Sequence, residues 1–126
     1  MSIEPELANG WFWRGFALEL LNRNEEAVVS YEKALKINAN YFTAWYRLGR
    51  VLEFLDRYAE AFTCHDQAVK LNSSFDEAWC HRGMVLEELG NYEEALISYD
   101  RAIEIKPDYT YREKREQILR SYKKNK

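Results

Sequence analysis

The stretch WCHRGMVLEELGNYEEALISYDRAIEIKP, residues 79–107, carries the pattern that decides the fold. Its large and small side chains recur in the preceding chain at a fixed interval of 34 residues. Three sets of residues share that interval: Trp11, Trp45 and Trp79; Gly15, Gly49 and Gly83; Leu18, Leu52 and Leu86. Two rows of alanines follow it as well: Ala27, Ala61 and Ala95; Ala34, Ala68 and Ala102. So many coincidences at one period indicate three copies of one structural unit.

The repeat organises residues 1–126 as a single domain. It comprises three units and a tail that does not match them: 8–41, 42–75, 76–109 and 110–126. In the first unit, Trp11, Gly15 and Leu18 are three or four residues apart, which is the spacing of a stripe on one helix face. The alanines form a second stripe, so each unit is predicted to be two antiparallel helices. Because one helix pair cannot bury both of its faces, successive pairs are expected to stack as an α-solenoid.

Small and polar residues mark the contacts and the ends of the predicted helices. The repeated glycines are expected to let a neighbouring helix approach closely. His65 takes the position of Tyr31 and Tyr99, so we expect it to be a packed core residue. The first helix of each unit is predicted to end at a residue that tolerates a left-handed backbone: Asn22, Asp56 and Gly90. Side-chain caps are expected at the starts of the second and third units: Asn40, and Ser74 with Glu77.

The motifs Trp-x-x-Arg/Leu-Gly-x-x-Leu and Ala-x-x-x-Tyr-x-x-Ala, at a period of 34 residues, resemble those of the tetratricopeptide repeat family. The resemblance covers residues 8–109, and the third unit is nearly the family consensus. It departs mildly at His65, and at Ala39 and Ser73, where the family often has proline. The resemblance implies an all-α fold, a right-handed α-solenoid of three antiparallel helix pairs plus a capping helix.

The tail, residues 110–126, resembles the solvating helix that closes such arrays. Glu113, Gln117 and Arg120 stand where the units have Trp, Gly and Leu, so the tail is not expected to receive another unit. An apolar side is expected to dock on the third unit: Tyr111, Ile118, Leu119 and Tyr122. The tail carries seven basic and two acidic side chains. A single short basic helix on an acidic body is a weak sign of nucleic-acid binding, so we do not expect a nucleic-acid partner.

Composition excludes several classes of protein. The chain has 126 residues, of which 47% are hydrophobic and 15% aromatic, with a net charge of −3, and this argues against disorder. No apolar run approaches the ~18 residues that a membrane helix needs. The acidic start of the chain predicts no secretory signal peptide. Two cysteines, Cys64 and Cys80, are too few for a disulfide scaffold, so we expect reduced thiols and a cytoplasmic location.

The sequence offers little that supports catalysis or holds a cofactor. Cys64–His65 and Cys80–His81 are adjacent pairs. Adjacent helical residues point about 100° apart, so neither pair is expected to aim both side chains at one ion or one substrate atom. No glycine-rich phosphate loop is present. We therefore expect no enzyme activity, no cofactor and no metal site.

In the tetratricopeptide repeat family, the first helix of each pair lines an inner groove where partners bind. The resemblance implies these groove residues: Asn9, Phe12, Trp13, Phe16, Leu20, Tyr46, Arg47, Arg50, Phe54, His81 and Met84. The first unit has three aromatic residues where the other units do not need them: Phe12, Trp13 and Phe16. We therefore expect an exposed aromatic partner site. Arg47 and Arg50 follow as donors for a carboxylate. The predicted partner is therefore a protein or peptide segment with apolar anchors next to an acidic residue.

Other interpretations remain open at this stage. The aromatic residues could join two copies of the chain as a homodimer, be covered by residues 1–7, or belong to a stable scaffold with no natural ligand. Some family members bind the acidic C-termini of chaperones through a clamp of Lys, Asn and Arg. The corresponding positions here hold Phe12, Phe16, Arg47, Glu77 and His81. Only Arg47 suits a carboxylate, so we do not expect that ligand.

Overall fold

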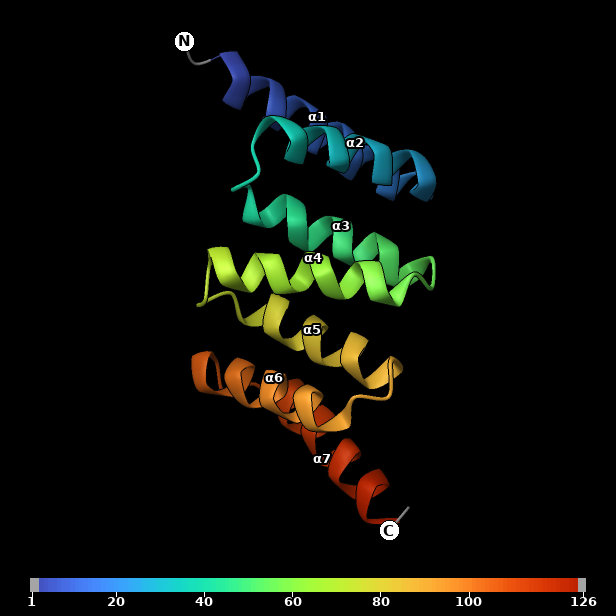
Figure 1. Cartoon of the computed structure of the whole chain (residues 1–126), viewed down its shortest axis with the longest axis vertical. Helices are drawn as coiled ribbons and strands as arrows, with labels where there is room; N and C mark the ends of the chain where they lie inside the picture. The colour runs from blue at the N-terminus through green and yellow to red at the C-terminus, as the bar shows by residue number, and fades with distance from the viewer. Residues whose placement is uncertain (1–2, 125–126) are drawn as a thin grey trace.

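The computed structural model describes the backbone of residues 3–124 and the side chains of residues 7–121, and its regular elements in that range are all helices. They are α1 (Ile3–Leu20), α2 (Asn24–Ile37), α3 (Phe42–Phe54), α4 (Tyr58–Leu71), α5 (Asp76–Glu88), α6 (Tyr92–Ile105) and α7 (Tyr109–Lys124). Neighbouring helices pair as α1–α2, α3–α4 and α5–α6, and the pairs stack along one axis (Figure 1). The predicted all-α solenoid is confirmed. None of the described helices is both long and apolar enough to span a membrane.

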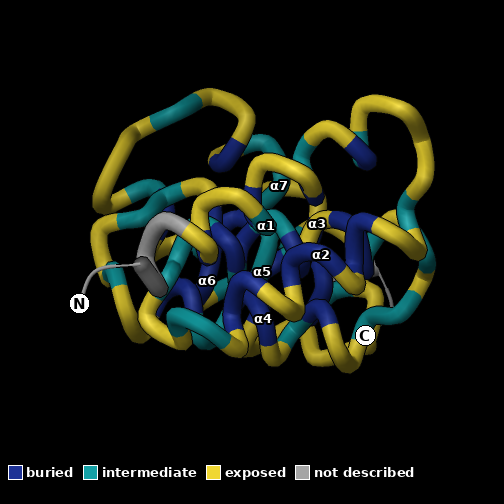
Figure 2. Tube along the Cα trace, turned by 90° about the horizontal axis from the view of Figure 1, so that it is seen from above, coloured by how far each residue is buried: buried dark blue, intermediate teal, exposed yellow. Residues whose placement is uncertain are grey.

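A glycine on the first helix of each pair faces a ring on the second. A Cβ atom built on each glycine would lie inside contact distance of that ring: 2.8 Å for Gly15 on Tyr31, 2.5 Å for Gly49 on His65 and 2.8 Å for Gly83 on Tyr99. All three rings are fully buried. Viewed along the stack, the buried stretches of successive helices lie over one another (Figure 2). The expected close approach and the core position of His65 are therefore confirmed.

The predicted helix ends are confirmed. Asn22, Asp56 and Gly90 follow α1, α3 and α5, and their φ angles are 59°, 60° and 81°. This left-handed conformation lets the chain reverse within a few residues, so that the second helix of the pair packs back on the first. At Asn91, the next residue, the side chain accepts a hydrogen bond from the backbone N–H of Glu94 at 3.5 Å.

The predicted caps at Asn40, and at Ser74 with Glu77, are wrong. Helices α3 and α5 follow Tyr41 and Phe75, neither of which makes a side-chain cap. The loops are instead held by asparagines one turn earlier, because Asn38 Oδ1 accepts from the Asn40 N–H at 3.1 Å. Asn72 Oδ1 repeats the contact with the Ser74 N–H at 3.2 Å.

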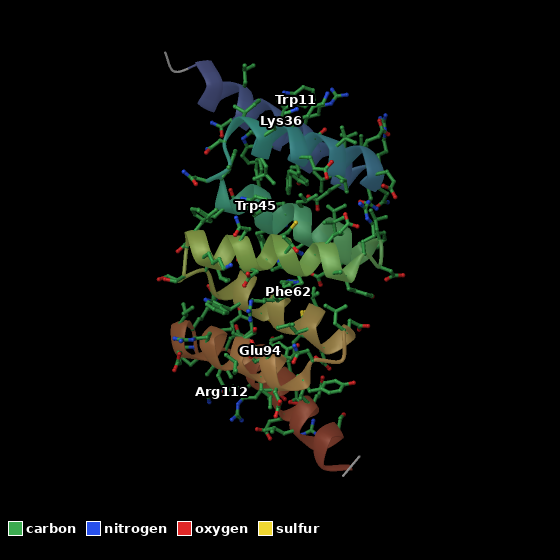
Figure 3. The ribbon with its side chains drawn as sticks, viewed as in Figure 1. Trp11, Lys36, Trp45, Phe62, Glu94 and Arg112 are labelled. Atoms are coloured by element: carbon green, nitrogen blue, oxygen red, sulfur yellow. The ribbon has the colours of Figure 1, made fainter. Side chains whose placement is uncertain are left out.

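Tryptophan indoles complete these loops. Trp45, near the start of α3 (Figure 3), donates from Nε1 to the Ala39 carbonyl at 2.8 Å. Trp79 makes the same bond to the Ser73 carbonyl at 2.9 Å. The repeated tryptophan therefore ties the start of each new pair to the loop that precedes it.

Helix α7 docks on the last pair, as expected. Tyr111 and Ile118 are buried, Leu119 is partly buried, and the side chain of Tyr122 lies outside the described residues. The Tyr111 hydroxyl donates to Asp76 Oδ2 at 2.6 Å, which links α7 to the start of α5. Residues 125–126 of the predicted capping helix also lie outside the described part of the chain.

Candidate functional site

Helices α1, α3 and α5 form the inner side of the stack. Helix α1 contacts α3 and α3 contacts α5, whereas within residues 3–124 no comparable contact joins α2 to α4 or α4 to α6. Helices that converge in this way lie on the concave side of a bent stack. Equivalent residues of successive units therefore form columns along this side, which we call the inner face.

One column of predicted site residues on the inner face, Phe12 and Tyr46, belongs to the hydrophobic core. Phe12 is 8% exposed and Tyr46 is 5% exposed, so the expectation that they form part of an open groove is wrong. Phe12 stacks on Tyr41 with ring centroids 5.0 Å apart. Tyr46 packs on Phe75 at 4.7 Å. Both rings fill the joint between their own helix pair and the next, and the smaller Cys80 is buried at the equivalent position of the third unit.

Apolar side chains do remain exposed on the inner face. Trp13 is 60% exposed, Leu20 71% and Phe54 73%. Phe16 is partly buried, and Trp13 meets it edge-on at 5.7 Å. The remaining predicted residues of this kind are placed as follows: Asn9 is exposed and Met84 is partly buried. Exposed aromatic and aliphatic groups on one face are what a partner would cover.

The two predicted arginines differ in how they are engaged. Arg47 is partly buried, with its guanidinium 4.8 Å from the Phe16 ring and Nε 3.7 Å from Glu19 Oε2. Arg50 is exposed, 5.9 Å from the Tyr46 ring, and it makes no ion pair with the described residues. Arg50 therefore offers the inner face an exposed cation whose charge no carboxylate of the described residues neutralises.

A carboxylate repeats behind these side chains. Glu19, Glu53 and Glu87 are 34 residues apart, and each meets the ring residue that lies 12 positions later. The Tyr31 hydroxyl donates to Glu19, and the Tyr99 hydroxyl donates to Glu87 at 2.9 Å. In the second unit, His65 Nε2 takes the place of the hydroxyl, 2.7 Å from Glu53. The ring–carboxylate pair is thus a constant part of the scaffold.

Glu53 also meets a second imidazole. His81 Nδ1, on α5, lies 3.0 Å from Glu53 Oε2, the same oxygen that His65 contacts. Burial opposes ionisation of this carboxyl, yet the hydrogen bonds from the two histidines lower the pKa of Glu53 to about 2. Burial lowers the pKa of His65, against the raising effect of Glu53. At neutral pH, Glu53 is therefore ionised and His65 is neutral.

Two hollows open on the inner face at the joints between units, and they share Arg50 and Phe54. One, of about 210 Å³, lies between α1 and α3 and also includes Glu19. The other, of about 290 Å³, lies between α3 and α5 and includes His81. Arg50 and Phe54 thus stand on the ridge between two recesses, where a bound segment would contact both.

The structure brings most of the predicted site residues onto one face, but it also makes a grouping that the sequence did not reveal. Glu53, His65 and His81 come from three helices and meet at one point. The adjacent Cys–His pairs do not act together: Cys64 and Cys80 are buried and free. The available signal was the recurrence of Glu at 34-residue intervals, which places Glu53 against whichever ring stands at position 65.

Comparisons with known proteins agree with this architecture. Models of the tetratricopeptide repeat match residues 42–75 and 76–109, and a TPR repeat model matches residues 20–53. No curated protein matches the chain in sequence. Among solved structures, the first TPR of Spaghetti (RPAP3), bound to the HSP90 peptide SRMEEVD, superposes with a TM-score of 0.90 at 22% identity, over 93% of this chain and 94% of that one.

Two further solved structures also superpose on most of the chain. The TPR domain of Arabidopsis OM64 has a TM-score of 0.89 at 20% identity, over 94% of this chain and 98% of that one. The N-terminal domain of stress-induced protein-1 from C. elegans has a TM-score of 0.85 at 17% identity, over 94% of this chain and 99% of that one. At these identities the likeness extends to the fold alone.

Proposed function

The chain belongs to the tetratricopeptide repeat family, a family of protein-interaction modules, and we propose that it is a non-catalytic adaptor that binds a protein or peptide segment along its inner face. The observation that carries this proposal is the ridge formed by Arg50 and Phe54. The Arg50 guanidinium makes no ion pair with the described residues, and the Phe54 ring beside it is largely exposed. The two free buried thiols also favour a reducing compartment, for which we propose the cytoplasm.

The ridge favours a ligand with an apolar or aromatic side chain next to an acidic one. Phe54 would pack against the apolar group, and Arg50 would pair with the carboxylate, for which a guanidinium supplies two parallel donors. The neighbouring hollow contains Glu53 and Glu88, so a ligand with a continuous run of carboxylates would be repelled there. The ligand is therefore expected to be mixed in character, with a micromolar dissociation constant for a short peptide.

The acidic peptide in the Spaghetti structure is not the ligand that we propose here. The clamp positions implied by family resemblance hold Phe12, Phe16, Arg47, Glu77 and His81. Of these, Phe12 is buried, and Arg47, the one suitable cation, is already paired with Glu19. Glu77 adds a negative charge that repels a terminal carboxylate.

A fluorescence-anisotropy screen tests the proposal with labelled peptides that combine aromatic and acidic residues, and with scrambled versions. Arg50→Glu and Phe54→Ala should each weaken the best peptide about 10-fold or more, as for a central contact residue. Ile97→Ala is the matched control, because Ile97 is half-exposed on α6, away from the inner face. Absence of any enriched peptide, or equal losses in Ile97→Ala, would contradict the proposal.

A second candidate function is self-association through the N-terminal aromatic residues. Trp13 and Leu20 favour it, because both remain largely exposed on α1, the first helix of the stack. Burial of Phe12 reduces the patch on which this alternative depended. Molar mass at increasing concentration separates the two functions.

A further inference from the structure

The second unit differs from its neighbours in the side chains around its repeated carboxylate. Glu53 lies between His65, from α4, and His81, from α5. One nitrogen of each histidine and one oxygen of Glu53 all lie within 4.8 Å of one another. Three helices thus bring two imidazoles and one carboxylate to a single point.

The fold does not require histidine at either place. In the first unit, the equivalent carboxylate is Glu19, which meets the Tyr31 hydroxyl and the Arg47 guanidinium. In the third unit, the Tyr99 hydroxyl fills the position of His65. A tyrosine and an arginine therefore satisfy the same carboxylate where only the scaffold matters. Neither is a good ligand for a transition-metal ion, whereas imidazole is the commonest one.

We propose that Glu53, His65 and His81 form a binding site for a divalent transition-metal ion, for which zinc is the best fit. Two imidazoles and a carboxylate are a known donor set for zinc, at ligand distances of about 2.0–2.2 Å, with one position left for water or another donor. The present separations of 2.7 and 3.0 Å from the carboxylate oxygen are those of hydrogen bonds. Rotations of the partly buried Glu53 and His81 side chains, with the His65 ring held in place, would bring the same atoms around one ion.

The His65 ring can offer Nε2 to a metal ion. When Nε2 of His65 binds the ion, its proton passes to Nδ1. Nδ1 is buried and has no hydrogen-bond partner among the described residues, so the transfer breaks no bond at that end of the ring.

The site also has an entrance. Glu53 and His81 line the hollow of about 290 Å³ between α3 and α5, and Glu88 contributes a second carboxylate to its wall. Arg50 stands on the same wall and opposes a cation, but its side chain is exposed and therefore screened by water and salt. The open coordination position faces this hollow, so water or a donor from solution can reach the ion.

Calorimetric titration of the full chain with Zn²⁺ at pH 7.5, after removal of any histidine tag and treatment with a chelator, tests the site. Zinc should bind once per chain and raise the midpoint of thermal unfolding by at least about 5 °C, reversibly with chelator. Co²⁺ in place of Zn²⁺ should give the visible absorption bands of a four- or five-coordinate ion with nitrogen and oxygen ligands. No binding at micromolar zinc overturns the proposal.

The chain itself supplies conservative variants. His65→Tyr recreates the pair made by Tyr31 and Tyr99, and His81→Arg recreates the pair between Arg47 and Glu19, so both should stay folded. Loss of a second-shell partner alone weakens a metal site 10–100-fold, so loss of either ligand should weaken zinc binding at least about 100-fold. Glu87→Gln, which removes the equivalent carboxylate of the third unit, should leave zinc binding unchanged. Zinc binding that persists in either histidine variant places the metal elsewhere and overturns the assignment.

Discussion

At the scale of single residues, the fold depends on three glycines, Gly15, Gly49 and Gly83, because the absence of a side chain leaves room for a buried ring. Gly49 is the tightest, because an added Cβ would lie 2.5 Å from the His65 ring. That ring is fully buried between its carboxylate partner and the next unit, so it has little room to move. Crowding of this kind typically costs about 1–3 kcal/mol of unfolding free energy.

Gly49→Ala should therefore lower the free energy of unfolding by about 2 kcal/mol in urea denaturation. Gly10→Ala is the matched control, since Gly10 lies within α1 and an added Cβ would meet nothing within 4 Å. Alanine there should raise stability by about 0.5–1 kcal/mol, because glycine is the weaker helix former. Equal effects at the two positions would mean that the ring yields to the new methyl group.

The buried thiols make the folded protein less stable at alkaline pH. Burial raises the pKa of Cys64 and Cys80 to about 12, from the ordinary thiol value of 9.0. Between these values the unfolded chain loses the proton while the folded chain keeps it, so stability is unaffected below about pH 9 and falls as pH rises above it. Each thiol should contribute a loss of about 1 kcal/mol by pH 10.

Urea denaturation between pH 7 and pH 10.5 measures this loss. Cys64→Ser is the natural comparison, because Ser30 and Ser98 stand at the equivalent buried positions of the other units. The variant should show a shallower decline than the parent chain. Both thiols of the folded parent should also react slowly with iodoacetamide at pH 8 and quickly in urea. Rapid alkylation of the folded chain would show that burial does not protect the thiols.

At the scale of secondary-structure elements, α7 is the piece attached by the smallest contact surface. It meets α6 along a side that includes Ile118, one of the most buried large side chains of the molecule. Ile118→Ala should lower unfolding free energy by about 2 kcal/mol, the lower end for such a truncation, because the cavity would lie at the end of the stack. Amide exchange should accelerate in α7 and in the face of α6 beneath it.

Ile105→Ala provides the control for α7. Ile105 ends α6 and is more than a third exposed, so its truncation should cost well under 1 kcal/mol. If Ile118→Ala behaves like Ile105→Ala, α7 is not held by this contact. The Tyr111 bond to Asp76 would then be the main attachment.

The helices and the reversals after α1, α3 and α5 were predictable, whereas the loops between units and the inner face were predictable only in part. Apolar spacing determines where each helix runs, and residues such as Asn22 that tolerate a left-handed backbone mark the reversals. The caps were misassigned, since the loops are held by Asn38 and by the Trp45 indole, at a distance along the chain that no cap pattern specifies. The prediction that Phe12 is exposed is wrong because its burial depends on contact with Tyr41 at the joint between helix pairs, and the periodicity within one unit does not specify that contact.

At the scale of the whole molecule, the question is whether the inner face meets a partner or a second copy. The adaptor function predicts a monomer, so light scattering should give about 15.1 kDa across a range of micromolar concentrations. Trp13→Ala should leave that mass unchanged. A parent mass that doubles with concentration, and returns to the monomer value in Trp13→Ala, would support self-association and move foreign partners to second place.

The inner contacts also give the stack a mechanical character. Along the inner face, α1, α3 and α5 bear directly on one another, while the outer helices α2, α4 and α6 meet their neighbours only through the next odd-numbered helix or α7. The inner face therefore resists shortening of the stack, because its helices are already in contact. The outer side can lengthen more easily, because its helices do not contact one another directly. A gentle pull on the two ends should lengthen the molecule by opening these joints in series before any single unit unfolds.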